Sequence, residues 1–306
     1  MEIGEFNRDV RERCAAKFES ALPPEELEQL YSLSAMESLL KSEAVPVADI
    51  DIFHSGHLMR LADVQKKSGK SSLDVVVEHF RRGSTIRIRD IDKCESHLKR
   101  FTAAVQRYFA AQSQVNLYLT PPGRNGFPPH FDITDVFIVQ CAGRKEWKLY
   151  HQYTNKAELP GMETNWDPDL FQPSVFPDGV SLNPGDVLYL PRGVMHEAYC
   201  ENRESLHLTV SLVPLTFAGL IAKALASVAE ADIEFRRRVP WSVEGEDAGI
   251  EAIAGQARAR ILELADRIDV NALLEEERGL LQTKPHPVSS GALESAIASL
   301  VGKDPR

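Results

Sequence analysis

Three residues with metal-binding side chains stand at a distinctive spacing. His130 and Asp132 are separated by one residue, and His196 follows a strand-like segment ending in PGDVLYLPRG. If the first two lie in a strand, their side chains project from the same face. Two histidines and one carboxylate form a facial triad that leaves three adjacent positions open on an octahedral metal, as in non-haem Fe(II) oxygenases. A zinc hydrolase fits less well, because such a site keeps a single water position. An HxD pair alone would more often be a surface pair, so the prediction depends on His196.

A lysine follows the first two candidate ligands in the same stretch. Lys145 lies among apolar and aromatic residues of an expected strand. Facing inward, it would need an anion, and a dianionic keto acid could offer it one carboxylate while the other end chelates a metal. The alternative is a solvent-facing lysine beside Arg144 and Lys148.

Two further strands carry polar residues at every second position. Asn116 and Tyr118 share one strand face, and His207, Thr209 and Ser211 share another. Polar residues on an inward face are costly unless they meet partners or a ligand. They predict either the wall of a ligand pocket or a satisfied buried network, and His207 could equally be a core histidine.

These candidates need a barrel to bring them together. Short strands are expected at Val115–Leu119, within Pro128–Tyr150, on both sides of the Asn-Pro-Gly-Asp turn in Val180–Leu190, and at Ser205–Val213. Many short strands separated by Gly/Pro turns indicate a barrel or jelly roll, a class that includes the cupins.

Helical patterns flank the expected barrel on both sides. Residues 1 to about 45 look helical, a strand-like pattern runs from Val45 to Ile52, a strand is expected at Thr85–Ile91, and a helix at His97–Ala111. After the barrel, Phe217–Val239 and Gly249–Leu281 again have helical periodicity. We therefore expect an N-terminal lobe (1–112) integrated with the core, a catalytic barrel (113–215), and a C-terminal helical region (216–306).

Composition limits the classes of function. The chain of 306 residues is 43% hydrophobic and 26% charged, with a formal charge of −10, which argues against a general nucleic-acid binder. No apolar run approaches the length of a membrane span, and the N-terminus has no secretory pattern. Four scattered cysteines read as reduced thiols, so we expect a cytoplasmic protein.

Three longer segments resemble one known family. NLYLTPPGRNGFPPHFDITDVFIVQCAGRKEWKLY, LNPGDVLYLPRGVMHEA and SLHLTVSL are similar to the JmjC-type ribosomal oxygenases, with the densest similarity from Gln114 to Val213. The resemblance implies a double-stranded β-helix and an Fe(II)- and 2-oxoglutarate-dependent hydroxylase of protein side chains. It implies that His130, Asp132 and His196 bind iron and that Lys145 pairs with the distal carboxylate of 2-oxoglutarate. Asn116, Tyr118 and Ser211 match the co-substrate pocket, with Thr209 and His207 as weaker matches.

The sequence also departs from that family. About 65 residues follow Trp241, which leaves little room for the family's winged-helix domain, and HFDITD replaces a more acidic motif. The expected substrate is a protein or peptide, a ribosomal protein among them, and the expected partner is a second copy bound through the C-terminal helices. N-demethylation, hydroxylation of a free or carrier-bound small molecule, and a non-catalytic metal-binding cupin remain alternatives.

Overall fold

We describe a computed structural model of the chain, covering residues 3–150, 159–160, 178–240 and 249–282. It contains two compact units, Met1–Pro214 with Pro285–Arg306, and Leu215–Lys284. The first unit holds both sheets and the second is helical, and each is described by itself.

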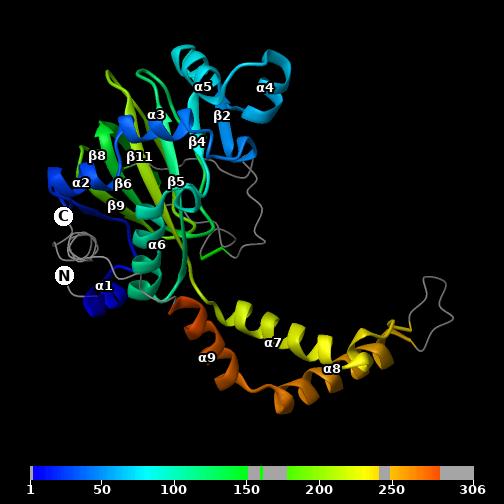
Figure 1. The fold of residues 1–306 in the computed structure, drawn as a ribbon. Coiled ribbons are helices and arrows are strands. Elements are labelled where there is room, and N and C mark those ends of the chain that lie inside the picture. Colours follow the sequence, from blue (N-terminus) through cyan, green and yellow to red (C-terminus); the bar gives the residue numbers. More distant parts are fainter. Residues whose placement is uncertain (1–2, 151–158, 161–177, 241–248, 283–306) are drawn as a thin grey trace. The chain divides into compact units, whose positions relative to one another are not determined.

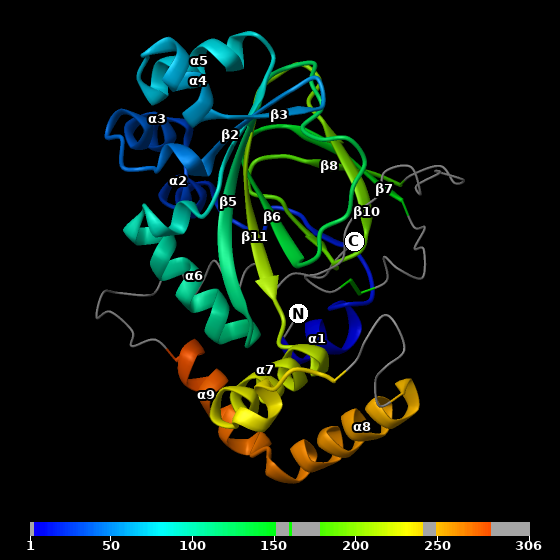
Figure 2. The same cartoon turned by 90° about the vertical axis from the view of Figure 1, so that its right-hand side faces the viewer.

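Two antiparallel sheets form the centre of the first unit (Figure 1). The main sheet has eight strands, in the order β1 (Ala16–Phe18), β9 (Val187–Leu190), β6 (Asp135–Gly143), β11 (Ser205–Val213), β5 (Gln112–Thr120), β4 (Thr85–Ile88), β2 (Ile50–His54) and β3 (His57–Arg60). The smaller sheet has the order β10 (Met195–Tyr199), β7 (Lys145–Tyr150) and β8 (Asp178–Leu182). The two sheets face each other, as Figure 2 shows. The predicted double-stranded β-helix class is confirmed.

The alternation of β11 explains how the main sheet serves two purposes. Its leucine and valine side chains belong to the large hydrophobic core on the helix-covered face: Leu206, Leu208, Val210 and Leu212. The intervening polar residues therefore point to the other face, toward the smaller sheet. β5 follows the same rule, with Val115, Leu117 and Leu119 in the core. A second cluster, which includes Ile138, Trp147 and Leu188, fills part of the space between the sheets.

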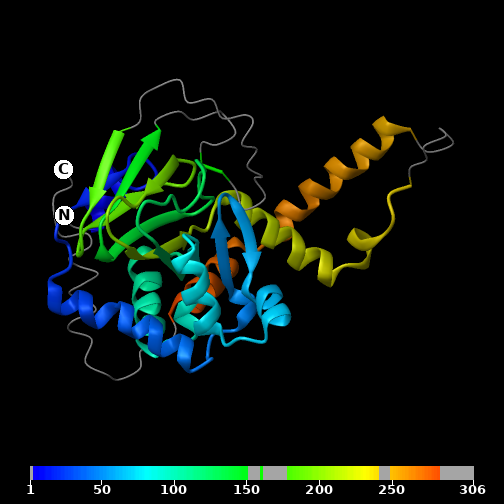
Figure 3. The ribbon, with the colours of Figure 1, turned by 90° about the horizontal axis from the view of Figure 1, so that it is seen from above.

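Helices cover the outer face of the main sheet. They are α1 (Ile3–Asp9), α2 (Pro24–Leu30), α3 (Leu33–Lys41), α4 (Leu61–Ser68), α5 (Ser72–Arg81) and α6 (Ser96–Phe109), with 3-10 turns η1 (Val47–Asp49) and η2 (Ile91–Lys93). Helix α6, which matches the helix expected at His97–Ala111, lies along β5 and buries Phe101, Val105 and Phe109. Pro24 opens α2, where its missing N–H has no helical partner to lose. Helix α4 lies beside the β2–β3 hairpin, which is seen from above in Figure 3.

Some element boundaries differ from those expected. The N-terminal stretch contains three short helices, as expected, and also the strand β1, which pairs with β9. The strand-like pattern from Val45 begins as the turn η1, and β2 starts only at Ile50. The two strands around the Asn-Pro-Gly-Asp turn exist, yet β8 and β9 belong to different sheets. The turn therefore carries the chain from one sheet to the other.

The second unit contains α7 (Phe217–Ala231), the 3-10 turn η4 (Ile233–Arg236), α8 (Ile250–Arg267) and α9 (Val270–Leu281). Thr216 caps α7 by accepting a hydrogen bond from the Gly219 N–H. The Gly249–Leu281 pattern is thus divided into two helices, with Asp269 capping the second. The part of the expected C-terminal helical region (216–306) that follows Gln282 lies outside the described residues. No described helix is long and apolar enough to cross a membrane.

Candidate active site

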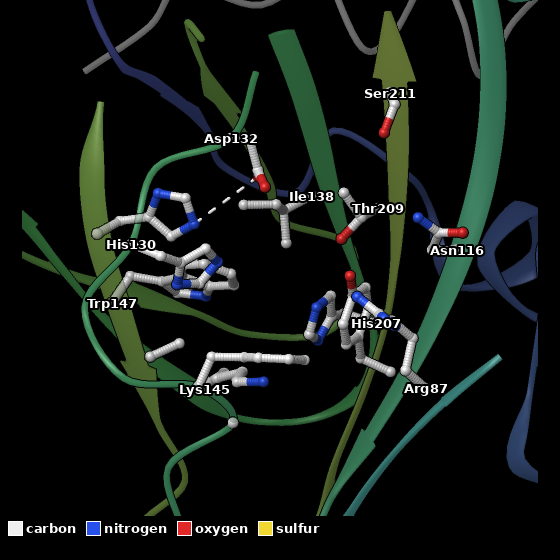
Figure 4. Close-up of a pocket in the computed structure, with 15 residues that line it drawn as sticks. Arg87, Asn116, His130, Asp132, Ile138, Lys145, Trp147, His207, Thr209 and Ser211 are labelled. Carbon is white, nitrogen blue, oxygen red and sulfur yellow. Dashed lines mark ion pairs between the residues drawn. The ribbon is translucent and has the colours of Figure 1, made fainter. Parts of the chain in front are cut away.

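A cavity of about 160 Å³ lies between the two sheets. All nine residues singled out from the sequence line it: Asn116, Tyr118, His130, Asp132, Lys145, His196, His207, Thr209 and Ser211. Figure 4 shows Thr209 and Ser211 along one strand, with Lys145 and Trp147 reaching the cavity from another. The structure thus brings the candidates together, while what each one binds stays a prediction.

The three candidate metal ligands converge at one side of the cavity. Their donor atoms all lie within 4.8 Å of one another, and Nε2 of His196 is 3.9 Å from Oδ2 of Asp132. The dashed line in Figure 4 marks this pair. His196 is almost fully buried and Asp132 is about one-third exposed, so the group is closed on one side and open on the other. Small side-chain rotations would let a single ion touch all three.

Backbone contacts fix the orientation of both imidazoles. Nδ1 of His130 is 2.9 Å from the carbonyl of Pro128, and Nδ1 of His196 is 2.9 Å from the carbonyl of Val194. A carbonyl can only accept, so each Nδ1 carries the proton and each Nε2 keeps its lone pair. This is the arrangement that metal-binding histidines normally adopt. Burial, together with the neighbouring His130, lowers the pKa of His196 to about 4, so its ring is neutral at pH 7.

The HxD pair is not held by a regular strand, which corrects the expectation from sequence. His130 forms an isolated bridge with His196, in which each backbone N–H donates to the other's carbonyl, at 3.0 and 2.8 Å. Asp132 lies in the irregular segment before β6. The ligands are therefore joined by two hydrogen bonds between a loop and β10 rather than by the pleat of one strand.

Lys145 opens β7 and points into the cavity. Its side chain is buried, and Nζ donates a hydrogen bond to Oγ1 of Thr120 at 3.1 Å. Burial lowers the pKa of Lys145 to about 8. The solvent-facing alternative for this lysine is wrong.

Some polar side chains around the cavity have hydrogen-bond or stacking partners, and others have none among the described residues. Tyr118 and His207 face each other across the two strands and stack at 4.9 Å with nearly parallel rings. Asn116 accepts a hydrogen bond from the Asp90 N–H at 3.0 Å. Nδ1 of His207 and Nε1 of Trp147, by contrast, are buried without a hydrogen-bond partner among the described residues. The polar groups around the cavity are therefore not all hydrogen-bonded among the described residues, because His207 on β11 and Trp147 on β7 each keep one available atom.

Sequence reasoning missed an arginine and its aromatic surroundings. Arg87, from β4, lines the cavity and donates to the buried carboxylate of Asp51. Its guanidinium lies 5.1 Å from the ring centre of Phe53 and 5.8 Å from that of Phe127. Burial alone would lower the pKa of Arg87, but Tyr118 and Asp51 raise it, so it stays charged. The alternation of TIRIRDI could have flagged Arg87 as inward-facing, whereas nothing local indicated its partners.

Comparison with known proteins supports the family resemblance and the fold. A sequence model of the JmjC domain matches residues 91–220. Ribosomal oxygenase 1 of Gallus gallus is 27% identical over 267 residues, which cover 81% of this chain and 43% of that protein. The bifunctional lysine-specific demethylase and histidyl-hydroxylase NO66 of Dictyostelium discoideum is 30% identical over 218 residues, covering 69% and 42%. The chain belongs to the JmjC-type ribosomal oxygenase family.

Solved structures support the fold of this JmjC-type chain. It superposes on E. coli YcfD with a TM-score of 0.57 at 17% identity, covering 94% of this chain and 74% of that one. The structure of YcfD in complex with cobalt and 2-oxoglutarate gives 0.54 at 17% identity, covering 94% and 73%. The chain spans less than half the length of these curated relatives. The family resemblance found in the sequence is confirmed.

Proposed function

We propose that this JmjC-type chain is an Fe(II)- and 2-oxoglutarate-dependent oxygenase that hydroxylates an amino-acid side chain in a protein or peptide. One observation carries the proposal: a single cavity holds a two-histidine, one-carboxylate group and, apart from it, a buried lysine with no acidic partner among the described residues. In this reading residues 113–215 are the catalytic barrel and residues 1–112 a lobe integrated with it.

The donor set fits iron. Two neutral imidazoles and a carboxylate are ligands that non-haem Fe(II) accepts as a facial triad. His130, Asp132 and His196 would hold the ion, with the tautomers of both histidines already fixed by backbone carbonyls. The exposed side of Asp132 leaves room for further ligands.

The opposite part of the cavity fits 2-oxoglutarate. The Lys145 ammonium and the Thr120 hydroxyl could bind the distal carboxylate, supplying a charge-assisted hydrogen bond in a dry environment. The Nε1–H of Trp147 and Nδ1 of His207, which have no hydrogen-bond partner among the described residues, are further groups that a ligand could satisfy. Asn116, Tyr118, Thr209 and Ser211 complete the polar wall.

When bound, iron and the keto acid would together activate dioxygen and supply the oxidising power for C–H hydroxylation. The chain's own residues would then have three tasks. The ligand residues fix the ion, Lys145 orients the keto acid, and the apolar residues Ile138 and Trp147 limit the access of water. Arg87, which remains charged at the cavity, would contact the substrate or its backbone.

The relatives support a ribosomal-protein substrate, since two of them are called ribosomal oxygenase and histidyl-hydroxylase. NO66 is also called a lysine-specific demethylase, which keeps N-demethylation as a second candidate reaction. Purified ribosomal proteins and peptides incubated with the chain, Fe(II) and 2-oxoglutarate should gain 16 Da by mass spectrometry. Formaldehyde release with loss of 14 Da would favour demethylation, and metal binding without affinity for 2-oxoglutarate would favour a non-catalytic cupin.

A second copy of the chain is the proposed partner of the helical unit. Several of its apolar side chains are exposed in the single chain, including Phe217 at 86% and Ile250 at 79%. Exposed apolar groups on this scale mark an interaction surface. The four free thiols fit a reducing compartment, so a cytoplasmic location is part of the proposal.

A further inference from the structure

A fully buried carboxylate stands behind the candidate metal ligands. Asp135 is the first residue of β6, and its side chain has no exposed surface. Its Oδ1 accepts a hydrogen bond from the backbone N–H of Arg192 at 3.0 Å. Arg192 belongs to the tight turn between β9 and β10, the turn that delivers His196 to the cavity.

That turn touches two of the three candidate ligands through its backbone. The Gly193 N–H donates to the carbonyl of Asp132 at 2.9 Å, and the Val194 carbonyl accepts from Nδ1 of His196 at 2.9 Å. Gly193 has a φ of +87°, a conformation that glycine adopts without strain. Asp135 thus holds one residue of the turn, and the next two residues hold Asp132 and His196.

The charged groups around Asp135 are better suited to fixing one arrangement of the turn than to stabilising the fold. The Arg192 guanidinium is 3.7 Å from Oδ1, Nε of Arg11 is 3.8 Å from Oδ2, and Arg192 also pairs with Glu12. Oδ2 of Asp135 and Nε of Arg192 nevertheless lack hydrogen-bond partners among the described residues. Buried charged groups that lack some of their hydrogen bonds stabilise a fold less than apolar packing would. Their best-attested role is to specify a single conformation. The residues after α1 are tied into the same cluster.

We infer that Asp135 is a positioning residue for the metal centre: by holding the Arg192 N–H, it sets the turn that aligns Asp132 with His196. The inference rests on the proposed metal site. Outer groups of this kind typically change metal affinity by about 10- to 100-fold when removed.

Asp186 provides a matched control. It too is a buried carboxylate that accepts backbone hydrogen bonds, from the N–H of Asn183 in its own turn at 3.0 Å and from the N–H of Ser20 at 2.8 Å. It also pairs with a basic residue, Lys17, at 3.3 Å. Its turn joins β8 to β9 and contains none of the candidate ligands.

The test is a Co(II) titration of the apo-protein followed by visible absorption, with circular dichroism and apo melting temperature measured in parallel. Asp135→Ala should bind Co(II) at least about tenfold more weakly than wild type and shift the absorption bands. Asp135→Asn, which keeps an acceptor oxygen, should recover most of the affinity. Asp186→Ala should lower the melting temperature and leave Co(II) affinity unchanged.

A folded Asp135→Ala protein with affinity and spectrum within twofold of wild type would overturn the inference, as would an equal loss in Asp186→Ala. Failure of the wild type itself to bind Co(II) would instead reject the metal site. If Asp135→Ala does not fold, hydrogen–deuterium exchange of the wild type decides. Co(II) should slow exchange at Arg192 and Gly193 about tenfold more than at residues 183–186, because coupling between two sites is reciprocal. Equal protection of both turns would count against it.

Discussion

The ammonium of Lys145 lies 3.1 Å from the hydroxyl of Thr120 and forms no ion pair with any acidic side chain of the described residues. A buried cation whose closest polar partner is a neutral hydroxyl is incompletely compensated. The first two predictions come from this pair.

Replacing Lys145 with Met should weaken 2-oxoglutarate binding by about 10- to 150-fold, because a charge-assisted hydrogen bond contributes roughly 1.5–3 kcal/mol. The same change should leave the melting temperature of the ligand-free protein equal or higher, since a desolvated amine is exchanged for an apolar chain. Calorimetric titration and thermal denaturation would measure both. A loss of stability with unchanged affinity would show that the lysine is structural.

The affinity for 2-oxoglutarate should fall about tenfold between pH 7 and pH 9. Burial lowers the pKa of Lys145 to about 8, so the charged fraction of the free protein drops from roughly nine-tenths to one-tenth over this range. A bound dianion favours the charged lysine, and binding is therefore strongest below the free pKa. The pKa of the neighbouring His207 lies well below its usual value, and burial raises the pKa of the Cys200 thiol. His207 therefore stays neutral from pH 7 to 9, and Cys200 is displaced toward higher pH. Lys145→Arg should bind with little pH dependence.

Loss of either histidine should abolish both metal binding and succinate formation. His130→Ala and His196→Ala each remove one of the three proposed ligands and should leave the fold largely intact. His57→Ala is the control, because His57 is exposed in the β2–β3 hairpin away from the cavity. Metal content by elemental analysis and succinate by mass spectrometry would both be measured. Wild-type turnover in the two ligand variants would refute the proposed site.

Gly143→Ala should destabilise the protein by about 3 kcal/mol or more, since overpacking is added to backbone strain. Gly143 has a φ of +68°, and an added Cβ would lie 1.7 Å from the Glu204 carbonyl oxygen. Gly56 has a φ of +80° with open space around it, so Gly56→Ala should cost only about 1–2 kcal/mol from backbone strain. Urea denaturation of the two variants would test the difference, and equal losses would rule out the steric contribution.

Phe217→Glu with Ile221→Glu should convert a dimer to a monomer in analytical ultracentrifugation. Both side chains are exposed, at 86% and 59%, on one face of α7. Ala226 is exposed on the opposite side of the helix, so Ala226→Glu should leave the mass unchanged. A monomeric wild type would reject the proposed partner.

Periodicity predicted most of the fold correctly. The alternation of Ser205–Val213 matched β11 because one face packs on the helices and the other on the cavity. Helix α6 was predicted from its helical periodicity, because one of its faces packs on the core. The assignment of β8 and β9 to different sheets could not be predicted, since a turn sequence does not specify which neighbour each strand pairs with.

The residues of the candidate site, like most of the fold, were predictable from the sequence. Metal-binding and inward polar residues stood out by chemistry and spacing, and all line one cavity. Arg87 was not found, because its role depends on contacts with Asp51 and Phe53 that only the folded chain creates. The unsatisfied atoms of Trp147 and His207 also required the structure, since an indole or imidazole in sequence says nothing about its partners.

The three-residue strand β1 has a consequence for handling the protein. Among the described strands it pairs with β9 alone, and it covers one edge of the main sheet from Val187 to Tyr189. A chain shortened past Phe18 would present the free backbone groups of β9 as a template for a strand from another molecule. Chains shortened in this way should therefore self-associate through sheet extension, detectable by light scattering, whereas affinity tags placed ahead of α1 leave that edge covered.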